Sequence, residues 1–349
     1  MGLVFRVDGM GDVRAFRVED PGRLLSAEHR EIVGGWTSDV YFAKTRDVLR
    51  RLGRLDAEVT AEVFAREGGV FCGLEEVRRL LVSVGADAQV EALWEGEEFE
   101  PREVVMRIRG RYGEFGLHET TILGILSSSS GWATAARRCV EAAGGLPVLC
   151  FGARHVHPSC APVMERSALV GGCSDASCIL GAKLMGREPR GTIPHAAILI
   201  AGDTLRLAEA YGEVLPPGEG LSVLVDTFKD EAEESLRLAE ALKERLTAVR
   251  LDTPGERGGV TPELVREVRY RLSMAGYGHV TVFVSGGLNP DRIRVLAEAG
   301  AGGFGVGSYI AHGTPRDMTM DLKEVDRRPV AKRGRLPGLT PTDRLKRVI

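Results

Sequence analysis

The sequence predicts an α/β protein whose larger part is a parallel sheet, either doubly wound or closed as a barrel, preceded by an α+β layer. The first observation behind this prediction is that, from about residue 117 onward, short β-branched runs alternate regularly with helical segments. Such alternation is typical of right-handed βα crossovers, which join parallel strands. The second observation is that residues before about 115 mix strands and helices without this regularity, which indicates a separate α+β layer.

The N-terminal part contains both kinds of element. Apolar and β-branched runs predict strands at residues 3–7, 13–18, 56–65, 88–95 and 103–112, the last two as a pair. Helical spacing predicts a mostly helical segment over 26–53, with Ser26 as a reasonable N-cap, and a helix over 74–83.

The second part supplies about six strands. We expect them at residues 146–154, 191–196, 221–228, 247–253, 280–287 and 302–309. The expected helices are residues 120–144, 161–172, 176–186, 197–212, 230–246, 261–276 and 290–300. The polar, basic tail from residue 319 no longer repeats this unit, so we expect it to pack elsewhere, against the first domain.

Composition and charge exclude several classes of function. The chain has 349 residues, of which 44% are apolar and 27% charged, as in a globular protein large enough for two domains. The net charge of −3 gives no global attraction to nucleic acid or to an anionic membrane. We see no signal segment and no apolar run long enough to span a bilayer, so we expect a cytoplasmic protein. The six cysteines form no C-x-x-C pair, so no zinc site is expected.

Polar or glycine-rich groups follow each of the six expected strands. They are Arg154, His155 and His157; His195; Asp226; Arg250 and Asp252; Ser285, Gly286 and Gly287; and Gly305 with Gly307. Because the carboxyl ends of parallel strands open on one face of the sheet, these groups are expected to line one pocket. Turn and cap chemistry alone would explain the serine and glycines, but it explains the arginines and histidines poorly.

The chemistry of these residue types points to a phosphorylated ligand. Two neighbouring glycine loops, SGGL and FGVGS, precede helices and would present free N–H groups to a phosphate. Paired Asp226 and Asp252 could hold Mg²⁺ or sugar hydroxyls, or stabilise positive charge at a ribosyl carbon. The alternatives are that Asp226 caps the next helix and that Asp252 pairs with Arg250. Arg154 suits a carboxylate or a pyrophosphate.

Seven stretches carry a resemblance to a known family. They are TSDVYFAKT at 37–45, FGARHVHP at 151–158, GGCSDASCILGAKLMGREPRGTIPHA at 171–196, VDTF at 225–228, RLDTPGERGG at 250–259, VSGGL at 284–288 and FGVGSYI at 304–310. Together, in this order, they resemble the nicotinate phosphoribosyltransferase family of type II phosphoribosyltransferases, in its shorter archaeal and bacterial form. The resemblance covers about residues 37 to 335.

The resemblance implies a fold and an activity. The fold would be an irregular, incomplete TIM-like barrel of about six strands (117–318), with an N-terminal α+β sandwich domain (1–116) that the tail (319–349) completes. The activity would be transfer of ribose 5-phosphate from phosphoribosyl pyrophosphate to nicotinate, giving nicotinate mononucleotide for NAD synthesis. It would use Mg²⁺, and ATP as a co-substrate through a phosphohistidine. A homodimer would share its active sites through the helical segment 26–52.

The resemblance also implies roles for individual residues. His195 matches the phosphorylated histidine, and a neutral imidazole is nucleophilic enough for that role near pH 7. Phe151 and Arg154 match the ring-stacking and anion-binding pair, and Asp39 and Tyr41 match the segment that reaches a neighbouring subunit. The remaining matches are Asp175 near the pyridine; Thr192 for substrate; Asp226, Arg250 and Asp252 around ribose, pyrophosphate and Mg²⁺; and Ser285, Gly286, Gly287, Gly305 and Gly307 for the 5′-phosphate.

Some features depart from the family and leave alternatives open. The C-terminal zinc knuckle of some members is missing, because no cysteine lies beyond Cys178. Lys44 stands where many relatives have arginine, and it could equally be a solvated charge. The alternatives are a quinolinate or nicotinamide phosphoribosyltransferase, or a non-catalytic relative that only binds phosphoribosyl pyrophosphate. A generic phosphate-binding isomerase or aldolase would explain the glycine loops alone.

Overall fold

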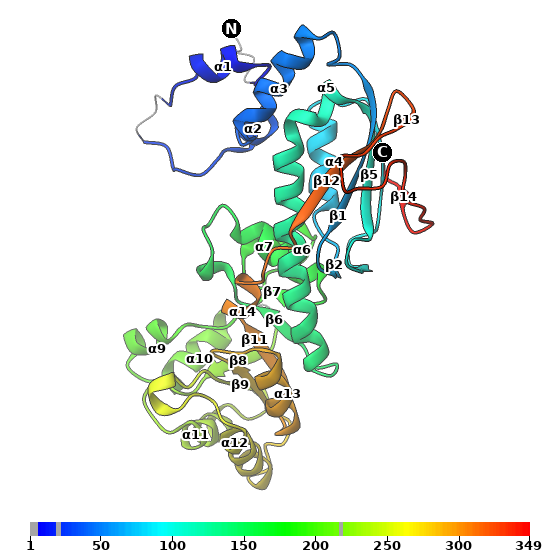
Figure 1. Cartoon of the computed structure of the whole chain (residues 1–349). Coiled ribbons are helices and arrows are strands. Elements are labelled where there is room, and N and C mark those ends of the chain that lie inside the picture. The colour runs from blue at the N-terminus through cyan, green and yellow to red at the C-terminus, as the bar shows by residue number, and fades with distance from the viewer. Residues whose placement is uncertain (1–5, 19–21, 216–218) are drawn as a thin grey trace. The chain divides into compact units, whose positions relative to one another are not determined.

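The computed structural model describes residues 6–18, 22–215 and 219–349, which form two compact units (Figure 1). One unit contains the chain up to residue 134 together with residues 314–349, and the other contains residues 135–313. No helix within the described ranges is long and apolar enough to cross a membrane.

The first unit is built on a six-stranded antiparallel sheet in the order β13-β12-β1-β5-β3-β14. Its strands are β1 (Glu58–Ala65), β3 (Ala88–Ala92), β5 (Val104–Arg111), β12 (Met318–Val325), β13 (Arg328–Pro329) and β14 (Lys346–Arg347). The short strands β2 (Gly69–Val70) and β4 (Glu98–Phe99) form a separate pair. The strands expected at 56–65, 88–95 and 103–112 are present, and β3 pairs with β5 as predicted.

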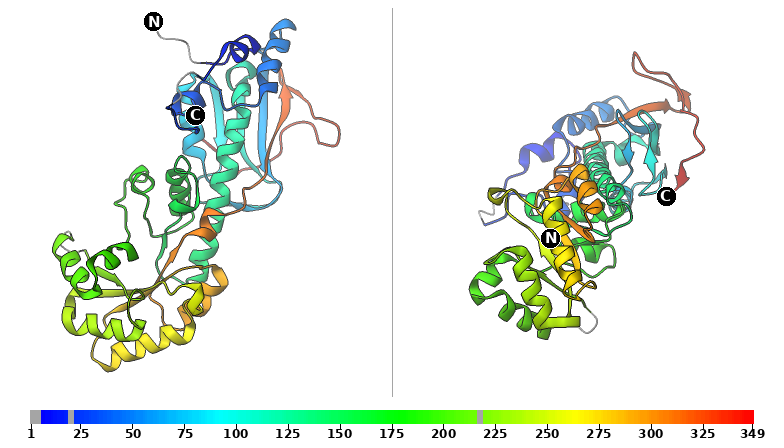
Figure 2. Two further views of the ribbon diagram at one scale, coloured as in Figure 1. Left: turned by 90° about the vertical axis from the view of Figure 1, so that its left-hand side faces the viewer. Right: turned by 90° about the horizontal axis from the view of Figure 1, so that it is seen from below.

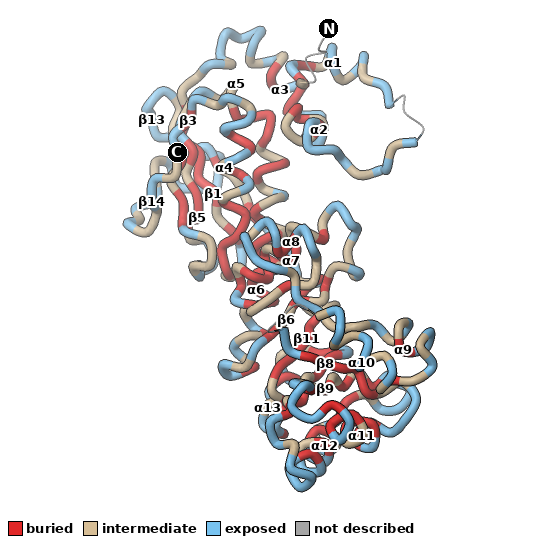
Figure 3. Tube along the Cα trace, turned by 180° about the vertical axis from the view of Figure 1, so that it is seen from behind, coloured by how far each residue is buried: buried red, intermediate tan, exposed pale blue. Residues whose placement is uncertain are grey.

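Two helices cover one face of this sheet and form its core. They are α4 (Leu74–Ser83) and the first half of α6 (Glu119–Ala142) (Figure 2). Leu81 of α4 and Ile122 of α6 pack with Val63 and Ile108 from the strands in one buried cluster. The red segments of the tube in Figure 3 show this burial along β1 and β5.

The C-terminal tail completes the sheet, as expected. Strand β12 pairs with β1 over its whole length, and β14 pairs with β3. The backbone N–H and the hydroxyl of Thr340 both donate to the buried carboxylate of Glu62, which also accepts from Arg107. The tail is therefore held both by strand pairing and by hydrogen bonds from Thr340 to a buried carboxylate.

The N-terminal region is helical where a strand was expected. Residues 10–15 form α1 (Met10–Ala15), so the strand predicted at 13–18 is wrong; residues 3–5 of the strand predicted at 3–7 lie outside the described residues. The N–H of Met10 donates to Asp47 of α3 (Val40–Arg51), a contact that a local strand pattern could not reveal. Helices α2 (His29–Val33) and α3 fall inside the segment predicted to be mostly helical. The short helices α5 (Tyr112–Phe115) and η1 (Gly116–His118) lead into α6.

The second unit is a six-stranded parallel sheet in the order β7-β6-β11-β10-β9-β8, which curls into an open half-barrel. Its strands are β6 (Val148–Cys150), β7 (Asp175–Ala176), β8 (Leu221–Leu224), β9 (Leu246–Leu251), β10 (Thr281–Ser285) and β11 (Gly303–Val306). The helices are α7 (Ala161–Val170), α8 (Ile179–Leu184), α9 (His195–Ala201), α10 (Thr204–Val214), α11 (Glu231–Leu242), α12 (Pro262–Met274), α13 (Pro290–Glu298) and α14 (Ser308–Ala311). This confirms the predicted combination of an incomplete barrel of parallel strands and an α+β domain.

One of the six strands is not where the sequence placed it. Residues 191–194 form no strand, and His195 begins helix α9 instead of ending a strand. Pro194 explains the difference, because it lacks the N–H that a ladder needs and its extended backbone suits the position before a helix. The sixth strand is β7, only two residues long, beside β6. The helix expected at 197–212 is broken at Gly202, which has a positive φ of 78°.

His118 and Glu119, neighbours at the start of α6, have opposite effects on the pH dependence of stability. His118 is fully buried, and neither ring nitrogen has a hydrogen-bond partner in the described structure. Burial, with nearby Arg6 and Arg46, lowers the pKa of His118 to about 4. Burial, with nearby Asp321, raises the pKa of Glu119 to about 7.

We predict that His118→Phe stabilises the protein relative to wild type at acid pH. Below pH 6.5 the unfolded chain binds a proton on His118 that the folded protein excludes until about pH 4. The wild type therefore loses about 3 kcal/mol between pH 7 and 4 that the variant keeps. Glu119 acts in the opposite direction between pH 4.5 and 7, so the two proteins must be compared by chemical denaturation at each pH. A difference that does not change with pH would contradict the prediction.

Candidate active site

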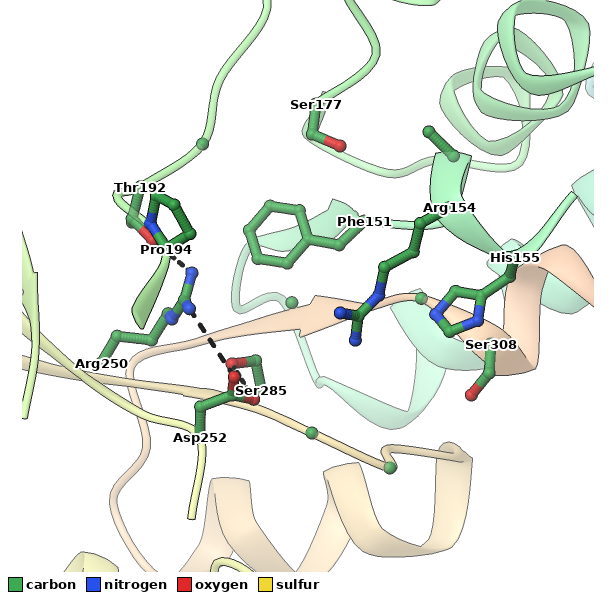
Figure 4. A pocket seen from close by; sticks show the side chains of 16 residues that line it. Phe151, Arg154, His155, Ser177, Thr192, Pro194, Arg250, Asp252, Ser285 and Ser308 are labelled. Atoms are coloured by element: carbon green, nitrogen blue, oxygen red, sulfur yellow. Dashed lines mark hydrogen bonds and ion pairs between the residues drawn. The ribbon is translucent and has the colours of Figure 1, made fainter. Parts of the chain in front are cut away.

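A cavity of about 370 Å³ opens where the strands of the half-barrel end (Figure 4). It is lined by the carboxyl ends of β6, β9, β10 and β11 and by the loop before α9. Ten of the predicted site residues line it: Phe151, Arg154, Thr192, Arg250, Asp252, Ser285, Gly286, Gly287, Gly305 and Gly307. The structure therefore brings most of the predicted site together.

Glycines let the wall of the cavity close tightly around its side chains. A Cβ on Gly305 would stand 2.3 Å from the Phe151 ring, and one on Gly307 would stand 2.8 Å from Nε2 of His155. Gly286 has a φ of +90°, and a Cβ there would stand 2.9 Å from Oδ1 of Asp252. At Gly287, with a φ of +60°, a Cβ would meet nothing within 4 Å. The backbone after β10 therefore borders open space, as a phosphate-binding loop requires.

Asp252 anchors a polar cluster at the ends of β9 and β10. The Ser285 hydroxyl donates to Asp252 Oδ1 at 2.8 Å, and Arg250 Nη2 lies 3.6 Å from Asp252 Oδ2. Arg250 also donates to the Thr192 hydroxyl in the loop before α9. Burial lowers the pKa of Arg250, while the carboxylates of Asp252 and Asp226 act in the opposite direction. Nη1 and Nη2 of Arg250 thus already face groups of the protein, and its Nε is buried without a hydrogen-bond partner in the described structure.

Arg154, unlike Arg250, has no ion pair with a carboxylate in the described structure. Figure 4 shows its guanidinium directed into the cavity beside the Phe151 ring. In the described part of the chain, no carboxylate or carbonyl pairs with it. Burial and the charge of Arg154 lower the pKa of the adjacent His155, with a further effect from His312. An anionic ligand group is therefore the natural partner for Arg154.

His195 and Asp226 form a pair next to the cavity, although neither lines it. His195 Nε2 lies 3.0 Å from Asp226 Oδ2, and Pro194, the preceding residue, is part of the cavity wall. The Asp226 side chain is 1% exposed and that of His195 is 38% exposed. A buried carboxylate thus orients an accessible imidazole, an arrangement that leaves Nδ1 free to act as a nucleophile.

Besides His195 and Asp226, three further predicted residues lie outside the cavity wall. Asp175 is paired with Arg190 at 3.6 Å. Asp39 and Tyr41 belong to the first unit, where Thr120 donates to Asp39 and the Tyr41 side chain is exposed. The expectation that they act in a neighbouring subunit stays a prediction.

The predicted metal site is only partly provided by the protein. Within the described residues, no cluster of three or more His, Cys, Asp or Glu side chains could cage an ion. Asp226 Oδ1, however, is buried without a hydrogen-bond partner in the structure, and Asp252 borders the cavity. This donor set fits Mg²⁺, which usually binds one or two carboxylates and takes its other ligands from water and phosphates.

Sequence reasoning missed two hydroxyl groups of the cavity wall, Ser177 and Ser308. Ser308 directly follows the FGVG loop, so its position was a usable signal. Ser177 follows β7, and a two-residue strand leaves no pattern to find.

Comparisons with known proteins place this geometry in context. Two family models match: the quinolinate phosphoribosyl transferase N-terminal domain over residues 39–130 and the C-terminal domain over 132–321. A nicotinate phosphoribosyltransferase of Mycobacterium tuberculosis is 32% identical over 70% of this chain, and the match spans only 55% of that protein's length. One from Bacillus subtilis is 29% identical over 59% of this chain and 42% of its own.

Solved structures show the same fold. A Pyrococcus furiosus protein described as a nicotinate-nucleotide pyrophosphorylase is 42% identical, with a TM-score of 0.85, covering 91% of this chain and 82% of that one. Human nicotinic acid phosphoribosyltransferase is 20% identical, with a TM-score of 0.67, covering 87% of this chain and 77% of that one. At that identity, the human protein supports the fold alone.

We predict that Gly305→Ala destabilises the second unit because its new methyl group would overlap the Phe151 ring. Overpacking of this kind costs about 1–3 kcal/mol. Gly255→Ala is the matched control, because its Cβ would meet nothing within 4 Å and its φ is not positive. Urea denaturation of the two variants should separate them. Equal stabilities would show that the ring does not rest on the β11 backbone.

Proposed function

Since the chain belongs to the quinolinate phosphoribosyltransferase family, we propose that it transfers ribose 5-phosphate from phosphoribosyl pyrophosphate to nicotinate, giving nicotinate mononucleotide and pyrophosphate for NAD synthesis. The observation that carries this proposal is the guanidinium of Arg154, which has no carboxylate or carbonyl partner within the described residues and points into the cavity beside the Phe151 ring. A pyridine ring could stack on Phe151 while its carboxylate pairs with Arg154.

The number of free positive charges favours nicotinate over quinolinate. Quinolinate has two carboxylates, whereas Arg250, the second arginine of the cavity, is already engaged by Asp252 and Thr192. One free guanidinium matches one carboxylate. Nicotinamide would leave the charge of Arg154 without an anionic partner, which is costly away from water.

The glycine loops and Asp252 are suited to the other substrate. Backbone N–H groups at Gly286, Gly287, Gly305 and Gly307 would hold the 5′-phosphate, and the Asp252 carboxylate would accept from ribose hydroxyls. Asp226 and Asp252 would hold Mg²⁺, which supplies positive charge for the departing pyrophosphate.

The chemistry then needs orientation more than acid or base catalysis. The pyridine nitrogen forms a bond to C1 of the ribose as the bond from C1 to the pyrophosphate oxygen breaks, and pyrophosphate leaves with the electron pair. Positive charge develops on the ribosyl carbon and would be stabilised by the carboxylate of Asp252. Phe151 and Arg154 would hold the ring in line for attack.

His195 is proposed to link this transfer to ATP. With Nε2 held by Asp226, Nδ1 would attack the γ-phosphorus of ATP, the bond to ADP would break, and ADP would leave. Asp226 would stabilise the positive imidazolium that results. Hydrolysis of the phosphohistidine would then draw the equilibrium toward the mononucleotide.

Two further parts of the proposal concern assembly. Asp39 and Tyr41, exposed on the first unit at the start of α3, would reach the pocket of a second copy in a homodimer. Tyr41 would then contact the face of the pyridine.

A quinolinate phosphoribosyltransferase is the second candidate. The observation that favours it is that both matching family models bear that name. Such an enzyme would release carbon dioxide and would not need ATP.

The decisive measurement is a product assay with phosphoribosyl pyrophosphate and Mg²⁺, offering nicotinate, nicotinamide and quinolinate separately, each with and without ATP. We predict product from nicotinate, with stimulation by ATP. Arg154→Lys is predicted to raise KM for nicotinate by about tenfold or more, because a point charge replaces a bidentate fork. Turnover of quinolinate alone would favour the second candidate, and binding of phosphoribosyl pyrophosphate without any turnover would indicate a non-catalytic relative.

We predict that His195→Ala removes the stimulation by ATP while leaving ATP-independent transfer measurable. Asp226→Asn should weaken both the transfer and its stimulation by ATP, because an amide is a poorer Mg²⁺ ligand than a carboxylate and stabilises a charged imidazolium less well. The measurements are initial rates at saturating substrates and ³²P labelling of the protein from γ-labelled ATP. Full stimulation in His195→Ala would exclude the phosphohistidine.

A further inference from the structure

Two fully buried carboxylates lie behind the cavity and are not part of its wall. Glu165 on α7 is 0% exposed, and Glu231, the first residue of α11, is 1% exposed. Burying a carboxylate costs free energy unless hydrogen bonds compensate for the lost water, so each hydrogen bond that these side chains accept helps to stabilise the fold around them. Glu165 and Glu231 contact residues in different parts of the cavity.

Glu165 accepts hydrogen bonds from two loops, one after β6 and one after β7, that form one side of the cavity. Its Oε1 accepts from the Ala153 N–H at 3.0 Å and from the Ser177 hydroxyl at 3.2 Å, and its Oε2 accepts from the Cys178 N–H at 2.5 Å. Ala153 precedes Arg154, and Ala153 and Ser177 both line the cavity. Figure 4 shows Ser177, Phe151 and Arg154 together in the wall of this cavity.

Every partner of Glu165 is a donor, and both of its oxygens are used. The described part of the chain gives it no lysine or arginine partner, so it does not serve as half of a surface ion pair. Burial raises the pKa of Glu165, while the N–H donors of Cys178 and Ala153 act in the opposite direction. A glutamine of the same shape would turn an NH₂ group toward one of these N–H donors.

Glu231 makes the corresponding contact on the opposite side. Its Oε1 accepts from the Thr253 hydroxyl at 2.7 Å, and its Oε2 lies 3.7 Å from Nη1 of Arg257. Thr253 is buried and directly follows Asp252, whose Oδ1 accepts from Ser285. Glu231 therefore fixes the end of β9, next to the glycine loop after β10.

We propose that Glu165 and Glu231 are positioning residues that each hold one half of the pocket. Glu165 sets the half with Phe151 and Arg154, which takes the pyridine acid. Glu231 sets the half with Asp252 and the glycine loop after β10, which takes phosphoribosyl pyrophosphate. The assignment of ligands to halves rests on the proposed function, whereas the division into halves rests on the hydrogen bonds.

The test compares Glu165→Gln with Glu231→Gln in the full chain. Each removes one buried negative charge from the same unit without changing side-chain shape, so each is the folding control for the other. In steady-state kinetics, Glu165→Gln should raise KM for the pyridine acid that the wild type uses by about tenfold or more, because a buried donor is left unsatisfied. Its KM for phosphoribosyl pyrophosphate should stay within about twofold. Glu231→Gln should show the reverse pattern.

Hydrogen–deuterium exchange of the unliganded proteins gives a readout that does not depend on activity. Glu165→Gln should speed amide exchange in peptides that contain Ala153 and Cys178, and leave residues 253–259 unchanged. Glu231→Gln should speed exchange in 253–259 only. If Glu165→Gln fails to fold, Glu165→Asp replaces it, because aspartate is too short to reach both loops. If Glu231→Gln fails to fold, Thr253→Val replaces it, because valine removes the donor to Glu231. The expected patterns stay the same.

The outcomes separate this inference from the proposed function. Equal increases in both KM values, a fall in kcat alone, or exchange that spreads across both halves would overturn the division. If the wild type turns over no pyridine acid, the proposed function fails and the exchange pattern alone decides whether the glutamates hold separate halves.

Discussion

The pocket depends on a strand that has no side chains on one of its two faces. Strand β11 lies between β6 and β10 and reads Gly303-Phe304-Gly305-Val306. On the side where Gly303 and Gly305 lie, the rings of Phe283 and Phe151 occupy the space that side chains would fill. The two rings lie 6.3 Å apart between centroids. A residue larger than glycine at position 305 would displace the Phe151 ring, which lines the cavity.

The sequence predicted the fold well wherever hydrophobic periodicity decides structure. Residues 281–285 form a strand and residues 262–274 form a helix, because in each segment the apolar side chains recur at the spacing that buries them together. Prediction failed where a proline or a distant contact decides. Pro194 turns an apolar run into the start of a helix, and Asp47 helps to hold Met10 at the start of a helix instead of in a strand. Neither effect has a local pattern.

The site could be predicted in outline because parallel strands bring their carboxyl ends together. That rule alone placed Arg154, Arg250 and Asp252 in one cavity, although they are far apart in the sequence. It could not give the relation between His195 and Asp226, which comes from a side-chain contact between a helix start and a strand end. Nor could it find Glu165, since a glutamate in a helix is usually solvated. The available signal was its spacing from Ala161 and Ala168, which puts it on the buried face of α7.

The sheet of the second unit ends at β7 on one side and at β8 on the other, and among the residues that the structure describes no strand joins these edges. The chain from 191 to 195 passes between α8 and α9 without a place in the ladder, and side chains fasten it: Thr192 to Arg250 and His195 to Asp226. An attachment made of two polar contacts, unlike a row of backbone hydrogen bonds, can be released one contact at a time. A change of charge on the His195 imidazole would therefore directly change the strength of its contact with Asp226, and with it the attachment of this segment to the barrel.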